Sequence, residues 1–204
     1  MKTHNKPVIM IDFGGVYFSE GGKIGLEKIA KKFKLSHEAV HSALRGDHRK
    51  KYSEGRITSD EYWKTVSKKI NLSRKQLKEA EHIWHSSYTP RKDMMRLVRK
   101  LRHKYRVSVL SANYAERVKY LDKKYNVLKE FHHHHFSFNH GITKPDVKLF
   151  LRAANKLNVQ PKDCIVVDDN KDFLKAVKKT GGKAVLFKDA KHLEKELGKL
   201  GVKI

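Results

Sequence analysis

The chain is 204 residues long, which suits one domain with an insertion or two small domains. Hydrophobic residues make up 39% and charged residues 33%, with 4 Pro and 12 Gly, and this composition excludes collagen-like, proline-rich and low-complexity proteins. No apolar stretch approaches the roughly 18 residues of a membrane helix, and the run VIMI near the N-terminus is too short for the core of a signal peptide. A single cysteine, Cys164, cannot form an internal disulfide. We therefore expect a cytoplasmic globular protein with no membrane contact.

Positive charge is in large excess. The 46 Lys and Arg against 22 Asp and Glu give a formal net charge of +24, which attracts polyanions, so nucleic acid is one partner to weigh. The densest basic stretch, residues 91–106, alternates its charges with apolar residues, as an amphipathic helix with a basic outer face does. This pattern favours a solvated helix face over a nucleic-acid surface, without excluding the second.

Short apolar runs alternate with helical patterns along most of the chain. The runs that predict buried strands are 7–11, 106–110, 131–138, 164–167 and 183–187. The segments with helical periodicity are 90–105, 115–125, 147–157 and 173–179. Thr89 before Pro90 is the expected cap of the first of these helices, and Cys164 is expected to be inert core. The alternation predicts an α/β fold with a parallel sheet covered by helices on both faces.

Residues 20–89 depart from this alternation, because they show helix after helix. Thr58 with Glu61 and Ser73 with Gln76 match the capping box that opens many helices. The two tryptophans, Trp63 and Trp84, are expected to pack these helices together. We therefore predict an all-helical block inserted after the first strand. The predicted division of the chain is core 1–19, helical cap 20–89 and core 90–204.

Polar residues follow the ends of the predicted strands: Asp12, Ser111, Lys144, Asp168 and Asp169. Loops after the carboxyl ends of parallel strands converge on one crevice, so these side chains should meet there. Carboxylates placed so close repel one another unless a cation lies between them, and hard oxygen ligands favour Mg²⁺. Ser111 and Lys144 would bind a phosphate, and Asp12 could attack phosphorus to form an aspartyl-phosphate.

Four segments of the chain resemble the four motifs of the haloacid dehalogenase-like hydrolases, most of which are Mg²⁺-dependent phosphatases. They are VIMIDFGGV, VSVLSAN, GITKPDVKLF and CIVVDDNKDFLKAV, in the family's order. GRITSDEYW is similar to cap sequences of the phosphatase-like branches. The resemblance implies a Rossmann-like three-layer core with a helical cap. It also implies that Asp12 is the nucleophile, that Ser111 and Lys144 hold the phosphate, and that Asp169, supported by Asp168, binds the metal.

One position departs from the family pattern. Most phosphatases of this family carry a second aspartate two residues after the nucleophile, and here that position is Gly14. Its carbonyl can still bind Mg²⁺, but the general acid/base, typically worth about 10²–10⁴ in rate, is missing. Glu20, Tyr17, Asp47 or Glu54 could replace it, or the substrate could have a good leaving group. A third interpretation is a catalytically degenerate protein that binds a phosphorylated ligand or nucleic acid.

Four consecutive histidines, His132 to His135, interrupt the third predicted strand. Successive strand side chains point to opposite faces, so at most two of them could share an ion. A partly polar edge strand is the favoured interpretation.

The expected function is hydrolysis of a small phosphate monoester with Mg²⁺ as the cofactor. Asn113, the last residue of the second motif, is a candidate for substrate contact; because asparagine is common in loops, an ordinary loop residue is the alternative interpretation. Gly14 and Gly15 are expected to permit a turn with positive φ. The sequence gives no indication of the oligomeric state.

Overall fold

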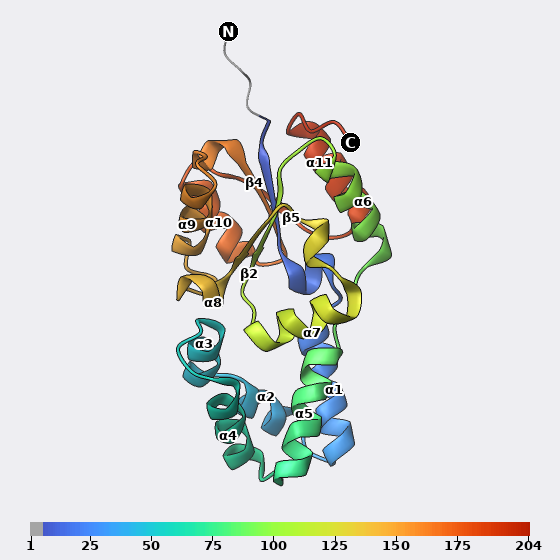
Figure 1. Cartoon of the computed structure of the whole chain (residues 1–204), viewed down its shortest axis with the longest axis vertical. Helices are drawn as coiled ribbons and strands as arrows, with labels where there is room; N and C mark the ends of the chain where they lie inside the picture. The colour runs from blue at the N-terminus through green and yellow to red at the C-terminus, as the bar shows by residue number, and fades with distance from the viewer. Residues whose placement is uncertain (1–5) are drawn as a thin grey trace.

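The computed structural model describes residues 6–204, which form a five-stranded parallel sheet with helices on both sides (Figure 1). The strands are β1 (Val8–Ile11), β2 (Val107–Ser111), β3 (His133–Phe136), β4 (Cys164–Asp168) and β5 (Lys183–Leu186). Their order in the sheet is β3-β2-β1-β4-β5, and every pairing is parallel. The predicted α/β class and the Rossmann-like core are thereby confirmed.

The central strand β1 explains why the predicted strands are continuously apolar. Ile9 pairs with Val107 on one side and with Ile165 on the other, and all four residues of β1 are buried. Alternation sends Ile9 and Ile11 into the hydrophobic cluster on one face of the sheet, while Val8 and Met10 enter the cluster on the opposite face. Because both faces are covered, apolar residues are needed at every position of the strand.

Two layers of helices cover the sheet (Figure 1). Those on the Ile9 face are α6 (Lys92–Arg102), α7 (Ala115–Tyr125) and α11 (Ala190–Lys199), and those on the other face are α9 (Lys148–Lys156) and α10 (Lys171–Lys179). Four short turns complete the core: Phe13–Tyr17 directly after β1, Leu128–Glu130, α8 (Ser137–His140) and Pro161–Asp163. Helix α6 buries its apolar residues and exposes most of its basic ones, as predicted.

The expected cap at Thr89 is wrong. Helix α6 begins at Lys92, and the chain before it is extended and pairs with the segment that leaves the core after β1. Thr89 O accepts a hydrogen bond from Ser19 N at 2.9 Å, and Arg91 N donates to Tyr17 O at 2.9 Å. The backbone groups that a helix start would have used are thus engaged in tertiary pairing.

The helical block comprises α1 (Gly21–Phe33), α2 (His37–Leu44), α3 (Asp47–Ser53), α4 (Ser59–Ile70) and α5 (Arg74–Ser86). It has a hydrophobic cluster of its own that includes Trp63 and Trp84, as expected. Both predicted capping boxes are present, with Glu61 N donating to Thr58 Oγ1 at 3.2 Å and Gln76 N to Ser73 Oγ at 3.4 Å. In Figure 1 these helices lie below the sheet. The division at 19/20 and 89/90 stays a prediction, and its first five residues lie outside the described ones.

The histidine-rich strand β3 lies at the edge of the sheet, as the sequence indicated. It is shorter than the predicted run 131–138, because Ser137 begins α8 and His132 precedes the strand. His132 Nδ1 accepts a hydrogen bond from Val107 N at 3.1 Å, and His134 Nε2 lies 2.8 Å from Leu128 O. Within residues 6–204, no group of three or more metal-ligating side chains includes a histidine.

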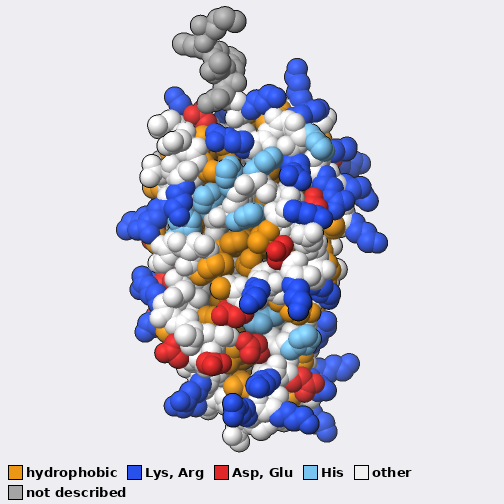
Figure 2. Space-filling view, in the orientation of Figure 1, with side chains coloured by type: hydrophobic (Ala, Val, Ile, Leu, Met, Phe, Trp, Pro, Cys, Tyr) orange, Lys and Arg blue, Asp and Glu red, His pale blue; other side chains and the backbone are white. Residues whose placement is uncertain are grey.

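Positively charged side chains are spread over the surface and do not gather in one patch on the face drawn in Figure 2. On the face drawn in Figure 2, lysine and arginine side chains lie over both the sheet region and the helical block, and histidines gather over the sheet region. Among residues 6–204, no helix has the length and apolar character needed to cross a bilayer.

The buried side chain of His135 is expected to make the protein less stable as the pH becomes acidic. Burial, together with the nearby His140, His133 and Lys156, lowers the pKa of His135 to about 4. The unfolded chain therefore binds more protons, so this contribution is complete above about pH 6.5 and is lost as the pH falls toward 4. We expect the free energy of unfolding to fall by roughly 3 kcal/mol between about pH 6.5 and pH 4 because of this residue. Chemical denaturation at several pH values measures it. His135→Met should flatten the slope while His103→Met, at an exposed position, keeps it, and equal slopes in all three proteins would contradict the assignment.

Candidate active site

A cavity of about 900 Å³ lies where the carboxyl end of the sheet faces the helical block. The sheet side contributes Asp12, Gly14, Asn113, Lys144, Asp168 and Asp169 to its lining. The helical block and the segments next to it contribute Glu20, Arg45, Arg49, Glu54 and Tyr88, and α7 contributes Arg117. The residues predicted from the strand ends therefore meet in one cavity, with the exception of Ser111.

A tight turn after β1 positions Asp12. Tyr17 N donates to Asp12 O at 3.3 Å, and the turn includes Gly15 at φ +78°. A Cβ atom at Gly15 would overlap Asp169 Oδ2, so glycine is required both by the backbone and by the close approach of the carboxylate. Gly14 differs, because its φ of −72° suits any residue and a Cβ there would lie 3.5 Å from Tyr88 Cε1, an ordinary contact. The expectation of positive φ is right for Gly15 and wrong for Gly14.

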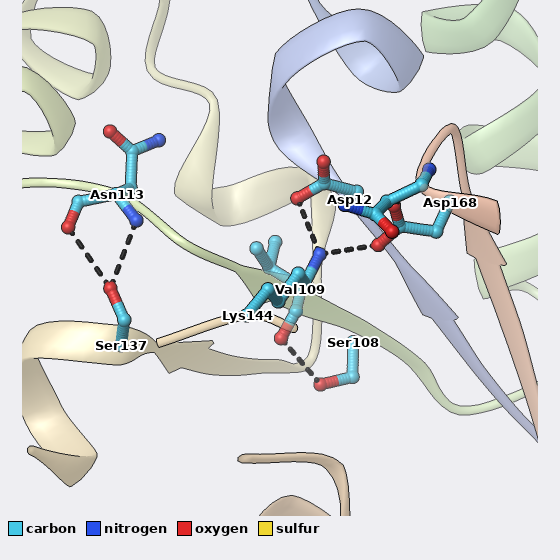
Figure 3. Close-up of polar contacts among 8 residues, drawn as sticks. Asp12, Ser108, Val109, Asn113, Ser137, Lys144 and Asp168 are labelled. Carbon is cyan, nitrogen blue, oxygen red and sulfur yellow. Dashed lines mark hydrogen bonds and ion pairs between the residues drawn. The ribbon is translucent and has the colours of Figure 1, made fainter. Parts of the chain in front are cut away.

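Three carboxylates and one lysine form the centre of the site. Figure 3 shows Lys144 between two of them, Asp12 and Asp168. Asp12, Asp168 and Asp169 each offer an oxygen atom within 4.8 Å of the others. Lys144 Nζ lies 2.9 Å from Asp12 Oδ1 and donates to Asp168 Oδ2 at 2.5 Å. Asp168 Oδ1 accepts from Asn170 N at 2.8 Å, so both oxygens of Asp168 are already engaged. Asp168 therefore holds Lys144 in place, while Asp12 and Asp169 keep oxygen atoms free for a ligand.

Burial controls the ionisation of this centre. Burial raises the pKa of Asp12, Lys144 lowers it and Asp168 raises it, and the net result is a pKa of about 7. Burial also lowers the pKa of Lys144, but Asp12 and Asp168 outweigh it, so the net pKa of the lysine is raised. One ammonium group thus balances only part of the negative charge, and a divalent cation would favour the ionised form of Asp12.

The donor set fits a hard cation. All candidate ligands are oxygen atoms, which Mg²⁺ prefers, and the described residues bring together no sulfur or imidazole ligand with them. Asp12 and Asp169 would hold the ion through carboxylate oxygens, and Gly14 lines the same cavity with its backbone. Asp168 belongs to the same group of carboxylates, and its predicted part in the metal site stays a prediction.

Two further predicted residues lie near the site with different surroundings. Ser111 ends β2 and is 1% exposed, but it is not among the residues that line the cavity. Asn113 does line it, and its side-chain oxygen accepts from Tyr114 N at 3.0 Å. Ser137 fixes the backbone of Asn113, accepting from its N–H at 3.0 Å and donating to its carbonyl at 3.1 Å (Figure 3). Both roles predicted for these residues stay predictions.

The structure separates the four candidates for the missing acid/base. Glu20 and Glu54 line the cavity. Tyr17 is fully buried in the hydrophobic core, with its ring 5.2 Å from that of Phe131. Asp47 pairs with Lys51 at 2.8 Å and does not line the cavity.

Sequence reasoning missed Arg49, Tyr88 and Arg117, which line the opposite wall of the cavity. One signal for Arg117 was present. It stands beside Val118 and four residues before Leu121, on the face of the predicted helix that must be buried. No sequence pattern marked Arg49 or Tyr88 as a cavity residue. They reach the cavity because the helical block packs over the sheet, and this packing cannot be predicted from the residues next to them.

Comparisons with known proteins identify the family of the chain. A family model described as haloacid dehalogenase-like hydrolase matches residues 18–181. An uncharacterised protein of Dictyostelium discoideum is 25% identical over 147 residues, 70% of this chain and 64% of that protein. A chloroplast flavin mononucleotide hydrolase of Arabidopsis thaliana is 34% identical over 64 residues, 31% of this chain and 26% of that enzyme. The chain thus spans less than two thirds of the length of either relative.

Solved structures share the fold. A haloacid dehalogenase family enzyme from Bacteroides thetaiotaomicron, in complex with magnesium and inorganic phosphate, has a TM-score of 0.75 and 22% identity, covering 93% of this chain and 99% of that one. A predicted haloacid dehalogenase-like hydrolase from Porphyromonas gingivalis has a TM-score of 0.75 and 17% identity, covering 98% and 99%. L-2-haloacid dehalogenase from Xanthobacter autotrophicus has a TM-score of 0.68 and 14% identity, covering 98% and 85%.

The chain belongs to the haloacid dehalogenase-like hydrolases.

Proposed function

We propose that this hydrolase is a Mg²⁺-dependent phosphatase that acts on a small phosphate monoester through an aspartyl-phosphate at Asp12. The observation that supports it most directly is the meeting of Asp12, Lys144, Asp168 and Asp169 at the end of the sheet. The similarity to a flavin mononucleotide hydrolase and to an enzyme solved with magnesium and inorganic phosphate also supports it.

The roles follow from the contacts of each residue. Asp12, at the floor of the cavity, would attack phosphorus, and the bond from phosphorus to the ester oxygen would break. Lys144 would pair with a phosphoryl oxygen while Asp168 holds its ammonium group. Mg²⁺ held by Asp12, Asp169 and the Gly14 carbonyl would neutralise charge on the transferring group. Water would then hydrolyse the aspartyl-phosphate and restore Asp12.

The leaving oxygen needs a proton that position 14 does not supply. Glu20 and Glu54, the acidic residues of the helical block among those that line the cavity, are the candidates. A substrate with a good leaving group would need neither, since protonation then contributes little.

The other assignments are proposals of the same kind. Residues 20–89 are proposed as the cap that closes over the substrate, with residues 1–19 and 90–204 as the core. Ser111 is proposed to donate to the phosphate, and Asn113 to contact the substrate.

Removal of metal tests the proposed function. Full-length protein with Mg²⁺ should release phosphate from p-nitrophenyl phosphate, and excess EDTA should lower the rate at least about tenfold. Adding Mg²⁺ back should restore it. An equal rate with EDTA would contradict the role of the metal, and no release at any Mg²⁺ concentration would contradict the phosphatase assignment.

A further inference from the structure

Arg117 is a buried cation without a carboxylate partner. Its side chain lines the cavity, and the residue is 4% exposed. Its Nη1 donates to Tyr88 Oη at 2.9 Å, whereas Nε and Nη2 are buried without a hydrogen-bond partner. Throughout residues 6–204, no Asp or Glu oxygen lies within ion-pair distance of it. A buried charge in this condition is costly unless something neutralises it.

Aromatic rings fix the position of this guanidinium. Arg117 Cζ lies 4.4 Å from the ring centre of Tyr88, 4.6 Å from that of Tyr114 and 5.0 Å from that of Trp84. Cation–π attraction offsets part of the cost of burial, but it gives no directed acceptor to Nε and Nη2. The cage therefore orients two donor nitrogens, Nε and Nη2, that a ligand could use.

A second arginine, Arg49, contacts Tyr114, which is one of the three rings around Arg117. Arg49 Nε donates to Tyr114 Oη at 3.0 Å, and the phenol raises the pKa of this already basic group. Two guanidinium groups thus contact one tyrosine, Arg49 at its hydroxyl group and Arg117 against its ring, and Arg45 and Lys50 line the same cavity. Like charges gathered this way repel one another, so an anion between them would stabilise the arrangement.

The acidic residues on this wall do not neutralise the arginines. Glu54 lies 3.2 Å from Arg56 Nε, and Glu20 forms no ion pair among the described contacts. Tyr88 connects this basic wall with the carboxylates, because its Cε1 atom lies 3.5 Å from where a Cβ of Gly14 would stand. Tyr88 thus contacts Arg117 with its hydroxyl group and lies beside Gly14 with its ring.

We propose that the substrate has a second anionic group, a carboxylate or a further phosphate, and that Arg117 and Arg49 bind it while the first phosphate lies at Asp12. This inference rests on the proposed phosphatase function and narrows its substrate class.

Matched ligand pairs test the inference by binding alone. The full-length Asp12→Asn variant, which should not turn substrate over, is titrated calorimetrically with Mg²⁺ present. Glycerol 3-phosphate is compared with 3-phosphoglycerate, which adds a carboxylate, and fructose 6-phosphate with fructose 1,6-bisphosphate, which adds a phosphate. We expect at least about tenfold tighter binding of the doubly anionic ligand in one pair, and the pair identifies the group.

Arginine variants assign the group to its site. The ratio to follow is the affinity for the doubly anionic ligand of a pair divided by the affinity for its singly anionic partner. In the Asp12→Asn background, Arg117→Met and Arg49→Gln should each bring this ratio near one. Arg96→Met, which removes the same charge from an exposed position on α6, should keep the ratio. Thermal unfolding follows the fold of each variant, and if Arg117→Met does not fold, Arg49→Gln at the cavity wall still provides the test.

The outcomes are distinguishable. Ratios below about threefold in both pairs would overturn the second anionic group and leave the phosphatase proposal standing. A ratio retained in both arginine variants would overturn their assignment. If no phosphate ester binds and the wild type releases no phosphate from p-nitrophenyl phosphate, the proposed function fails, and this inference fails with it.

Discussion

Asp12→Asn is expected to lower Mg²⁺-dependent phosphate release from p-nitrophenyl phosphate by at least about 10⁴-fold. The amide has no free anionic oxygen to attack phosphorus, and it is a weaker ligand for a divalent cation. The variant therefore removes two of the functions that the site needs. Single-turnover assays with wild type and variant at equal Mg²⁺ measure the difference.

Folding should be little affected by this change, which separates chemistry from stability. Asn has nearly the same size as Asp, and burial already disfavours the ionised form of Asp12. A similar melting temperature for variant and wild type is therefore expected. Asp172→Asn, on the exposed start of α10, is the matched control and should keep full activity. A rate for Asp12→Asn within tenfold of wild type would reject Asp12 as the nucleophile.

Gly15→Ala is expected to lower the rate at least about a hundredfold, because a shift of about 1 Å in a catalytic group can have that effect. The added methyl group would overlap Asp169 Oδ2 and would also strain a residue at φ +78°. Asp169 would have to move away from Asp12, so the apparent affinity for Mg²⁺ should fall as well. Rates measured over a range of Mg²⁺ concentrations show both effects.

Gly14→Ala is the matched control at the neighbouring position. The substitution keeps the backbone carbonyl that is proposed to hold Mg²⁺. The φ of −72° suits alanine, and the new methyl group would lie 3.5 Å from Tyr88 Cε1. Activity within about threefold of wild type is expected for a contact of ordinary length. If both variants lose activity equally, the close approach of Gly15 to Asp169 is not what positions the carboxylate.

The sheet was predictable because its signals are local. A strand covered on both faces needs an unbroken apolar run, and Val8–Ile11 and Cys164–Asp168 each provide one that ends at a polar residue. Parallel pairing then aligns those ends, which is why Asp12 and Asp168 could be placed together from the sequence. The run predicted around His133–Phe136 was too long, because an edge strand has one free side and tolerates polar residues, so that its ends are not marked by a change in polarity.

The rest of the site was not predictable for a related reason. Arg49 and Tyr88 reach the cavity through the packing of the helical block over the sheet, and nothing in their neighbouring residues encodes that. At Thr89 a valid local signal failed, because pairing with Ser19 outweighed the tendency to begin a helix. Arg49 and Arg117 come from different helices, so only the tertiary structure shows that they line the same cavity.

Because Ser19 and Thr89 pair with each other, we expect that the helical block between them can be replaced by another segment. Ser19 N donates to Thr89 O at 2.9 Å and Thr89 N donates to Ser19 Oγ at 3.1 Å, so the block leaves and rejoins the sheet region at neighbouring points. A foreign insert with closely spaced ends could therefore be transplanted between these two residues with little disturbance of the strands. Chimeras built at this junction would join the same carboxylates and lysine to different helical walls of the cavity.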